Sequence, residues 1–166
     1  MKKIKCYLES SSLWNLYYEE QGSEMVEYCL ENSQFDCISS IWSQLEIERG
    51  IKKRENQEEI TSNEAEQLQL FIDTDIKRLV NKKKLSLEKI DDNYILNAKK
   101  FIRQYNLYAS DALHLATATI LSCKMIIVDD YHFKRLDEKI MEKEGLLIYS
   151  TLNTISNLER KMNLKE

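Results

Sequence analysis

The chain has 166 residues, of which 43% are hydrophobic and 31% are charged, and its formal net charge is −4. A chain of this length buries about 70% of the surface that its unfolded form exposes, and we predict a single domain over residues 1–166. The apolar content excludes a disordered protein, and the negative charge argues against binding nucleic acid through bulk positive charge. Because the apolar runs are too short to span a membrane and residues 1–10 lack the apolar segment of a signal peptide, we expect a cytoplasmic protein without membrane contact.

Short apolar runs alternate with longer amphipathic segments along the chain. In chain order we predict a strand over residues 4–9, helices over 10–18 and 24–32, a strand over 35–39, helices over 40–55 and 61–83, a strand over 84–87, helices over 91–106 and 110–122, a strand over 124–130, a helix over 132–145, a strand over 146–150 and a terminal helix. A serine is expected to cap the first helix. Strands that alternate with helices of ten or more residues indicate a parallel sheet covered by helices.

Two of the predicted helices have apolar residues at helical spacing, which predicts the face that each buries. In the helix over 61–83 these residues are Ala65, Leu68, Ile72, Ile76, Leu79 and Val80. In the helix over 91–106 they are Tyr94, Ile95, Ala98, Phe101, Ile102 and Tyr105. The four cysteines are scattered singly, without a C-x-x-C pair, so we expect buried small side chains rather than disulfides or a zinc site.

Acidic residues stand at the ends of two predicted strands. Glu9 ends the first strand, and Asp129 and Asp130 end the fourth. In open parallel sheets, functional groups gather beyond the carboxyl ends of the strands, where the strand order reverses. If the order is 3-2-1-4-5, the two strands are neighbours and their terminal carboxylates lie roughly 5 Å apart. Carboxylates that close repel one another unless a proton or a cation lies between them.

Two further acids complete a candidate metal site. Asp111 stands at the N-terminus of the helix that leads into the fourth strand, and Glu46 lies at the border of the apolar stripe of the helix over 40–55. Four carboxylates without a histidine or thiolate in range favour a hard cation, Mg²⁺ or Mn²⁺. One such ion lowers the pKa of a bound water and holds a phosphate oxygen, and two clamp both oxygens of an in-line displacement.

Four blocks carry these acids: CYLESSSLWNLYYEEQGSE, CISSIWSQLEIERG, YNLYASDALHLATATIL and IIVDDYHFKRL. In order and spacing they resemble the acidic blocks of the PIN-domain family, and in particular the VapC-like ribonuclease toxins of type II toxin-antitoxin pairs. The resemblance covers residues 4–149. It implies a Rossmann-like three-layer α/β/α sandwich, endonucleolytic cleavage of RNA with Mg²⁺ or Mn²⁺, inhibition by a small antitoxin protein, and a homodimer.

The resemblance also assigns roles to residues. It implies that Glu9, Glu46, Asp111 and Asp130 are the four catalytic and metal-binding acids, and that Ser11 helps to position a water molecule at the metal. Asp129 would be an additional ligand. Two departures from the family pattern concern the metal geometry: the first acid is Glu9 rather than an aspartate, and Val128 stands where the family often has threonine or serine.

Each of these acids also has a purely structural interpretation. Asp111 beside Ser110 can be a helix N-cap, and Glu46 can form an ion pair on its own helix with Arg49 or Lys52. Asp129 and Asp130 can begin a turn after the strand.

Other polar and aromatic groups near the acidic blocks are interpreted in the same way. His114 is better explained as a packed, hydrogen-bonded histidine than as a general base. The basic groups over residues 52–54, 81–84 and 99–103 are solvated faces unless they flank the acids and contact phosphate. Trp14, Tyr17 and Tyr18 belong to the core or a dimer surface, with base stacking as the alternative.

Two other functions remain open from the sequence. A degenerate PIN module would bind RNA or a protein partner without cleaving. A receiver-like phosphoacceptor also gathers acids at strand ends, but it requires an acidic pair after the first strand, where this chain has one acid followed by three serines.

Overall fold

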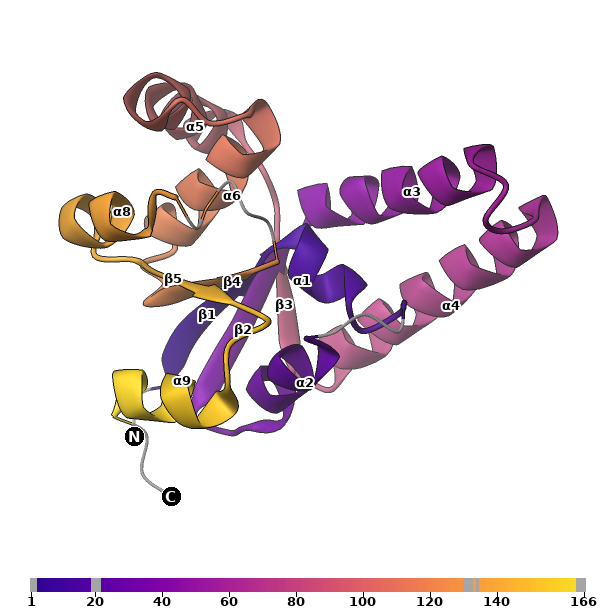
Figure 1. Ribbon diagram of the computed structural model, residues 1–166, viewed down its shortest axis with the longest axis horizontal. Coiled ribbons are helices and arrows are strands. Elements are labelled where there is room, and N and C mark those ends of the chain that lie inside the picture. Colours follow the sequence, from indigo (N-terminus) through magenta and orange to yellow (C-terminus); the bar gives the residue numbers. More distant parts are fainter. Residues whose placement is uncertain (1–2, 19–21, 130–132, 134, 164–166) are drawn as a thin grey trace.

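The computed structural model describes residues 3–18, 22–129, 133 and 135–163. Its centre is a parallel five-stranded sheet with the order β3-β2-β1-β4-β5, which confirms the predicted order (Figure 1). The strands are β1 (Ile4–Leu8), β2 (Phe35–Ser40), β3 (Leu85–Glu88), β4 (Met125–Val128) and β5 (Leu147–Ser150). Because β1 and β4 are neighbours, with Leu8 paired to Ile127, the residues that follow these two strands lie side by side.

Helices connect the strands and cover both faces of the sheet. They are α1 (Ser10–Trp14), α2 (Ser23–Glu31), α3 (Ile41–Asn56), α4 (Ser62–Asn81), α5 (Asp92–Tyr105), α6 (Ala109–Ile120), α8 (Asp137–Glu144) and α9 (Ile155–Met162). None of the helices in the described ranges is both long and apolar enough to cross a bilayer.

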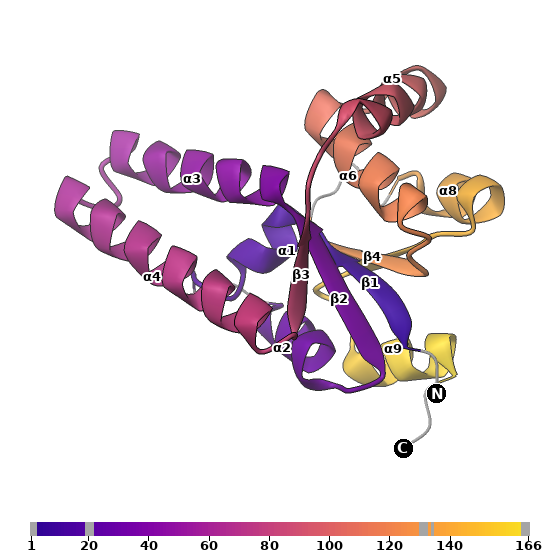
Figure 2. The same ribbon diagram turned by 180° about the vertical axis from the view of Figure 1, so that it is seen from behind.

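The alternation of side chains along β1 separates two cores. Cys6 and Leu8 point to the layer formed by α1, α2, α3, α4 and α9, whereas Tyr7 points to the layer formed by α5, α6 and α8. The two views in Figures 1 and 2 show these helical layers on opposite faces of the sheet. The result is the predicted α/β/α sandwich. All four cysteines are buried and free, which confirms the interpretation of them as small apolar side chains.

Helices α3 and α4 form an arm that projects beyond the sheet (Figures 1 and 2). The two helices pack against each other through buried isoleucines, among them Ile47 and Ile51 of α3 and Ile72 and Ile76 of α4. At the start of α4, Thr61 and Glu64 form a capping box, because the Thr61 hydroxyl accepts from the Glu64 N–H at 3.2 Å and the Glu64 carboxylate accepts from the Thr61 N–H at 2.8 Å.

On two helices the buried face is narrower than the apolar face that we predicted. On α5, Ile95 and Ile102 are exposed by 41% and 36%, although both were expected to point inward. Helix α5 packs mainly on α6, so only a narrow stripe of its surface has a partner. On α4, Val80 is likewise exposed. Of the predicted helix over 132–145, α8 covers Asp137–Glu144 and a turn at 135–136 precedes it, while residues 132 and 134 lie outside the described ranges.

Candidate functional site

Glu9 stands directly after β1 and is itself the N-cap of α1. Its carboxylate accepts hydrogen bonds from the Ser11 N–H at 2.9 Å, from the Ser10 hydroxyl at 2.6 Å and from the Ser11 hydroxyl. The prediction of a serine cap was therefore wrong: the glutamate folds back over the first turn and leaves the serines as donors. Glu9 is only 5% exposed, and these hydrogen bonds fix the position of its carboxylate at the edge of the sheet.

Ser11 joins the ends of β1 and β4. Its hydroxyl accepts from the Asp129 N–H at 3.0 Å, while the Glu9 N–H donates to the Ile127 carbonyl at 3.1 Å. The Asp129 carboxylate, in contrast, accepts from the Thr151 hydroxyl at 2.9 Å. Asp129 thus follows β4 as Glu9 follows the neighbouring strand β1, but its carboxylate is engaged in the turn after β5.

Asp130, which the resemblance makes the fourth acid, lies outside the described residues.

Glu46 faces α6 across the end of the sheet. One of its carboxylate oxygens accepts from the Ser110 hydroxyl, and the other lies 2.5 Å from His114 Nε2. Trp42 supports this contact, because its indole N–H donates to the Ser110 hydroxyl at 2.7 Å. The interpretation of Glu46 as an ion-pair partner on its own helix is wrong, since Lys52 pairs instead with a glutamate one turn later.

His114 is fully buried beneath the acids. Its Nδ1 lies 2.8 Å from the Tyr7 hydroxyl, which donates to the Ser40 hydroxyl at 3.0 Å, and its Nε2 is 3.5 Å from a Glu9 oxygen. This confirms a packed, hydrogen-bonded histidine. It also corrects the expectation that no histidine lies in range of the carboxylates. The signal was present in the sequence, because residues three apart on a helix share a face and His114 follows Asp111 at that spacing.

The histidine and its glutamate favour opposite charges. Burial alone would lower the pKa of His114, but the hydrogen bond to Glu46 and the charges of Glu9, Glu46 and Asp111 raise it overall. Burial alone would raise the pKa of Glu46, but the hydrogen bonds from His114 and Ser110 bring it below its ordinary value. Both directions favour an imidazolium paired with a carboxylate.

Asp111 lies in the first turn of α6 rather than at its cap. The helix begins at Ala109 and the N-cap is Tyr108, so the interpretation of Asp111 as an N-cap is wrong. Asp111 lines the same cavity as Glu9 and Glu46.

This cavity has a volume of about 440 Å³ and opens between the end of the sheet and the arm. Its acidic wall consists of Glu9, Glu46 and Asp111, and its remaining walls are lined by Ser10, Ser11, Trp14, Ile47, Gly50, Lys53, Arg54, Gln57 and Glu59. One ligand atom each from Glu9, Glu46 and His114 lie within 4.8 Å of one another, close enough for a single cation. The carboxylate oxygens suit a hard divalent metal ion, whereas an imidazolium at His114 has no lone pair for a metal and would act through Glu46.

The comparison with protein families gives a match to the PIN domain over residues 6–139. Among curated proteins, none matches the chain.

Solved structures with the same fold include a toxin-antitoxin complex from Klebsiella pneumoniae, with a TM-score of 0.58 and 13% identity over 86% of this chain and 95% of that one. VapBC2 from Rickettsia felis, bound to a DNA fragment from its promoter, gives a TM-score of 0.58 and 15% identity over 89% and 98% of the two chains. PAE2754 from Pyrobaculum aerophilum gives 0.56 and 10% identity over 98% and 99%. At these identities the likeness concerns the fold.

Proposed function

The chain belongs to the PIN domain family, and on that premise we propose that it is a metal-dependent endoribonuclease that acts in the cytoplasm as the toxin of a type II toxin-antitoxin pair. The observation that carries the proposal is the acidic wall of the cavity. Glu9, Glu46 and Asp111 come from three elements far apart in the sequence and line one opening. Twenty-eight acids in the chain make some clusters unavoidable, but a cluster at the strand-order reversal is where an α/β sheet places its functional groups.

Glu9 and Asp111 would hold the ion, Mg²⁺ or Mn²⁺, together with Asp130, and Asp129 stays a possible further ligand. When bound, the ion supplies a Lewis acid for a phosphate oxygen and lowers the pKa of a bound water. Glu46 would orient the attacking water, because Ser110 and His114 fix both of its oxygens at the wall of the cavity.

Ser11 has a role in this proposal that differs from the one the resemblance implied. Its hydroxyl binds the Glu9 carboxylate and accepts from the Asp129 N–H, so Ser11 would hold the first acid in place in addition to positioning water. His114 does not line the cavity as the described residues form it. It would therefore support Glu46 from below rather than contact the RNA.

The direct test is cleavage of structured RNA in Mn²⁺ by the wild type and by Asp111→Asn. A matched control is Asp92→Asn, which removes an exposed aspartate from the first turn of α5. We expect Asp111→Asn to lose cleavage while Asp92→Asn keeps it, with a 5′-phosphate on one product. Equal cleavage by wild type and Asp111→Asn would refute the mechanism.

The assembly belongs to the same proposal. Two of the structures that share the fold are described as a toxin-antitoxin complex and as VapBC2, which supports a small antitoxin as partner, and we include a homodimer. A short antitoxin-like reading frame beside this one, whose product forms a complex with the chain in size-exclusion chromatography with light scattering, would support the toxin assignment. The same measurement on the chain alone gives its oligomeric state.

One observation favours a second function, that of a module which binds RNA without cutting it. The Glu9 carboxylate already accepts three hydrogen bonds from Ser10 and Ser11, and a carboxylate so engaged is a weaker ligand than a free one. The two functions differ in their response to metal. Retained RNA binding, without cleavage and without a Mn²⁺-dependent increase in melting temperature, would favour the binding module.

A further inference from the structure

The cavity has a second wall that the acidic cluster does not explain. On α3, the residues four, seven and eight positions after Glu46 are Gly50, Lys53 and Arg54, and all of them line the cavity. These spacings place them on the same face of the helix as Glu46. At 1.5 Å per residue, Lys53 lies about 10 Å along the helix axis from Glu46. The face therefore changes from acidic near the sheet to basic further along the arm.

Aromatic rings lie against this basic part of the arm. Trp14 and Tyr18 are stacked, with ring centroids 5.6 Å apart and planes inclined by 17°. The Arg54 guanidinium lies over both rings, 3.5 Å from the Tyr18 centroid and 5.4 Å from that of Trp14. The Trp14 ring also meets the α3 backbone at Gly50, where an added Cβ would stand 3.6 Å from it. Trp14 is only partly buried and lines the cavity, so part of the indole surface faces it.

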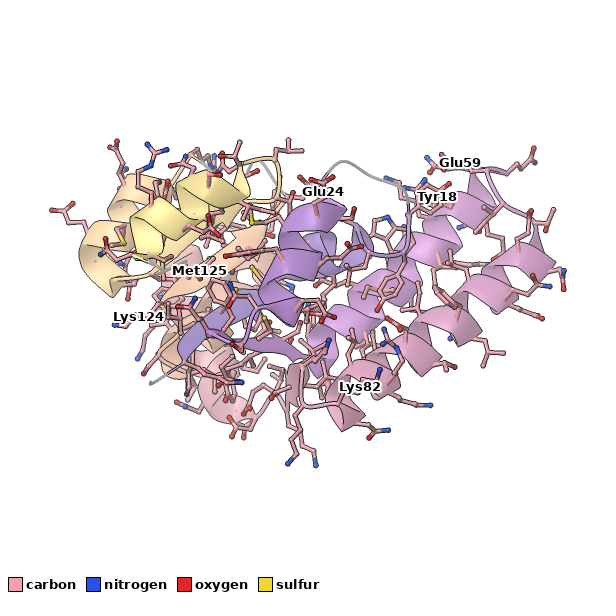
Figure 3. The ribbon with its side chains drawn as sticks, turned by 90° about the horizontal axis from the view of Figure 1, so that it is seen from below. Tyr18, Glu24, Glu59, Lys82, Lys124 and Met125 are labelled. Carbon is pink, nitrogen blue, oxygen red and sulfur yellow. The ribbon has the colours of Figure 1, made fainter. Side chains whose placement is uncertain are left out.

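Two of the cations on this part of α3 form ion pairs with glutamates of the arm. Arg54 pairs with Glu59 at 2.8 Å, and Figure 3 shows Glu59 and Tyr18 close together at the arm. Lys52 pairs with Glu55 at 2.7 Å. Lys53, exposed between these two pairs, has no ion-pair partner among the residues that the structure describes. Within the part of the chain that the structure describes, its ammonium is therefore available to an external anion.

We propose that Trp14, Lys53 and Arg54 form a subsite for an unpaired nucleotide of the RNA, next to the phosphate that the acidic wall would attack. The base stacks on Trp14 and the backbone phosphate binds Lys53, while Arg54 fixes the aromatic pair. The inference rests on the proposed ribonuclease function. It gives a chain of net charge −4 a local cationic contact for a polyanion, because Lys53 and Arg54 line the same cavity as the acidic wall.

The chemistry of the wall favours single-stranded RNA. Stacking on an aromatic side chain requires a base that has left its duplex, and it contributes about 1–3 kcal/mol per base. A lysine that binds one phosphate of a single strand contributes about 0.7 to the slope of log affinity against log salt.

The lysines at adjacent positions of α3 provide a matched test. Lys53→Gln and Lys52→Gln remove the same charge one residue apart, but only Lys53 lines the cavity. Affinity is measured by fluorescence anisotropy with a labelled single-stranded RNA oligonucleotide of mixed sequence in EDTA, so that metal-dependent cleavage does not interfere. We expect Lys53→Gln to weaken binding and to reduce the salt slope by about 0.7, and Lys52→Gln to leave the slope unchanged.

The stacking component is tested with Trp14→Leu, which should weaken binding roughly 5-fold to 150-fold. Trp14→Phe, which keeps an aromatic ring, should recover part of the loss. A thermal melt of each variant identifies any loss that comes from unfolding, and the lysine pair remains decisive in that case. Glu59→Gln, which releases Arg54 from its ion pair, should tighten binding.

The outcomes separate this inference from the proposed function. If the wild type cleaves RNA in Mn²⁺ while Lys53→Gln and Trp14→Leu bind like the wild type, the subsite is refuted and the nuclease stands. If binding depends on Lys53 and Trp14 but the wild type cleaves nothing, the subsite stands and the nuclease is refuted. Equal affinity for the oligonucleotide and for its duplex would refute the unpaired base.

Discussion

Removal of the Tyr7 hydroxyl tests the buried hydrogen bonds under the acidic wall. Tyr7 is fully buried, and its hydroxyl lies 2.8 Å from His114 Nδ1 and 3.0 Å from the Ser40 hydroxyl. Tyr7→Phe keeps the ring and leaves both polar groups buried without this partner. Since each such group costs about 1–3 kcal/mol, we expect a loss of about 2–6 kcal/mol in the free energy of unfolding. For a chain of this size that corresponds to a decrease of roughly 4–24 °C in melting temperature.

Tyr17→Phe is the control for the same chemical change. The Tyr17 hydroxyl is only partly buried and donates one long hydrogen bond, of 3.3 Å, to Asp75, so its loss should cost less than about 1 kcal/mol. Urea denaturation of the two variants and the wild type gives both free energies. If Tyr7→Phe destabilises no more than Tyr17→Phe, the buried hydrogen bonds do not hold His114 as we argue.

Three further predictions concern metal, pH and a turn. If the site binds Mn²⁺ with a dissociation constant near 1 mM, about 10 mM Mn²⁺ should stabilise the wild type by about 1.4 kcal/mol, or roughly 3–6 °C in melting temperature. In differential scanning fluorimetry, the melting temperature of Asp111→Asn should rise by less. Because the pKa of His114 is raised in the folded protein, its contribution to stability is complete below the unfolded pKa of 6.5 and is lost as the pH rises through the folded pKa. Because the pKa of Glu46 is lowered, its contribution is complete above the unfolded pKa of 4.5 and is lost as the pH falls through the folded pKa. The advantage of wild type over Glu46→Gln in urea denaturation should therefore be largest between these limits and shrink toward alkaline and strongly acid pH; an advantage independent of pH would contradict the pairing. Gly22 has a φ of 112° and a Cβ there would stand 2.6 Å from a threonine, whereas Gly145 has a φ of 65° and open space around it. Gly22→Ala should therefore destabilise the protein by more than Gly145→Ala, for which we expect roughly 1–2 kcal/mol. Similar melting temperatures for the two variants would show that the close contact relaxes.

The frame of the site follows from local features of the sequence. Apolar runs predicted the strands, and the order of the strands placed Glu9 beside the end of β4. The prediction places Asp111 at the same edge of the sheet, because the helix that precedes β4 must begin near the end of that strand. These inferences succeed because each depends on an element and its neighbour in the sheet.

The contacts under the acids do not follow from local features. Tyr7 and His114 are 107 residues apart, and Glu46 and His114 are 68 apart. Whether such side chains meet depends on the rotamers of three elements that converge from both faces of the sheet, which no periodicity specifies. The exposure of Ile102 on α5 also depends on tertiary packing, because an apolar stripe predicts which face of a helix is buried but not how much of that face another element covers.

The arm formed by α3 and α4 has a consequence for local unfolding. Within the described residues, the turn near Gln57 lies at the far end of the arm from the sheet, whereas the inner turns of α3 contact α1 and the sheet as well as α4. Local opening requires less free energy where fewer apolar contacts are lost, so the amide hydrogens near Gln57 should exchange with deuterium sooner than those near Ile47. Glu46 belongs to the slowly exchanging end and Arg54 to the fast one, so a ligand bound across the cavity would slow exchange mainly at the tip.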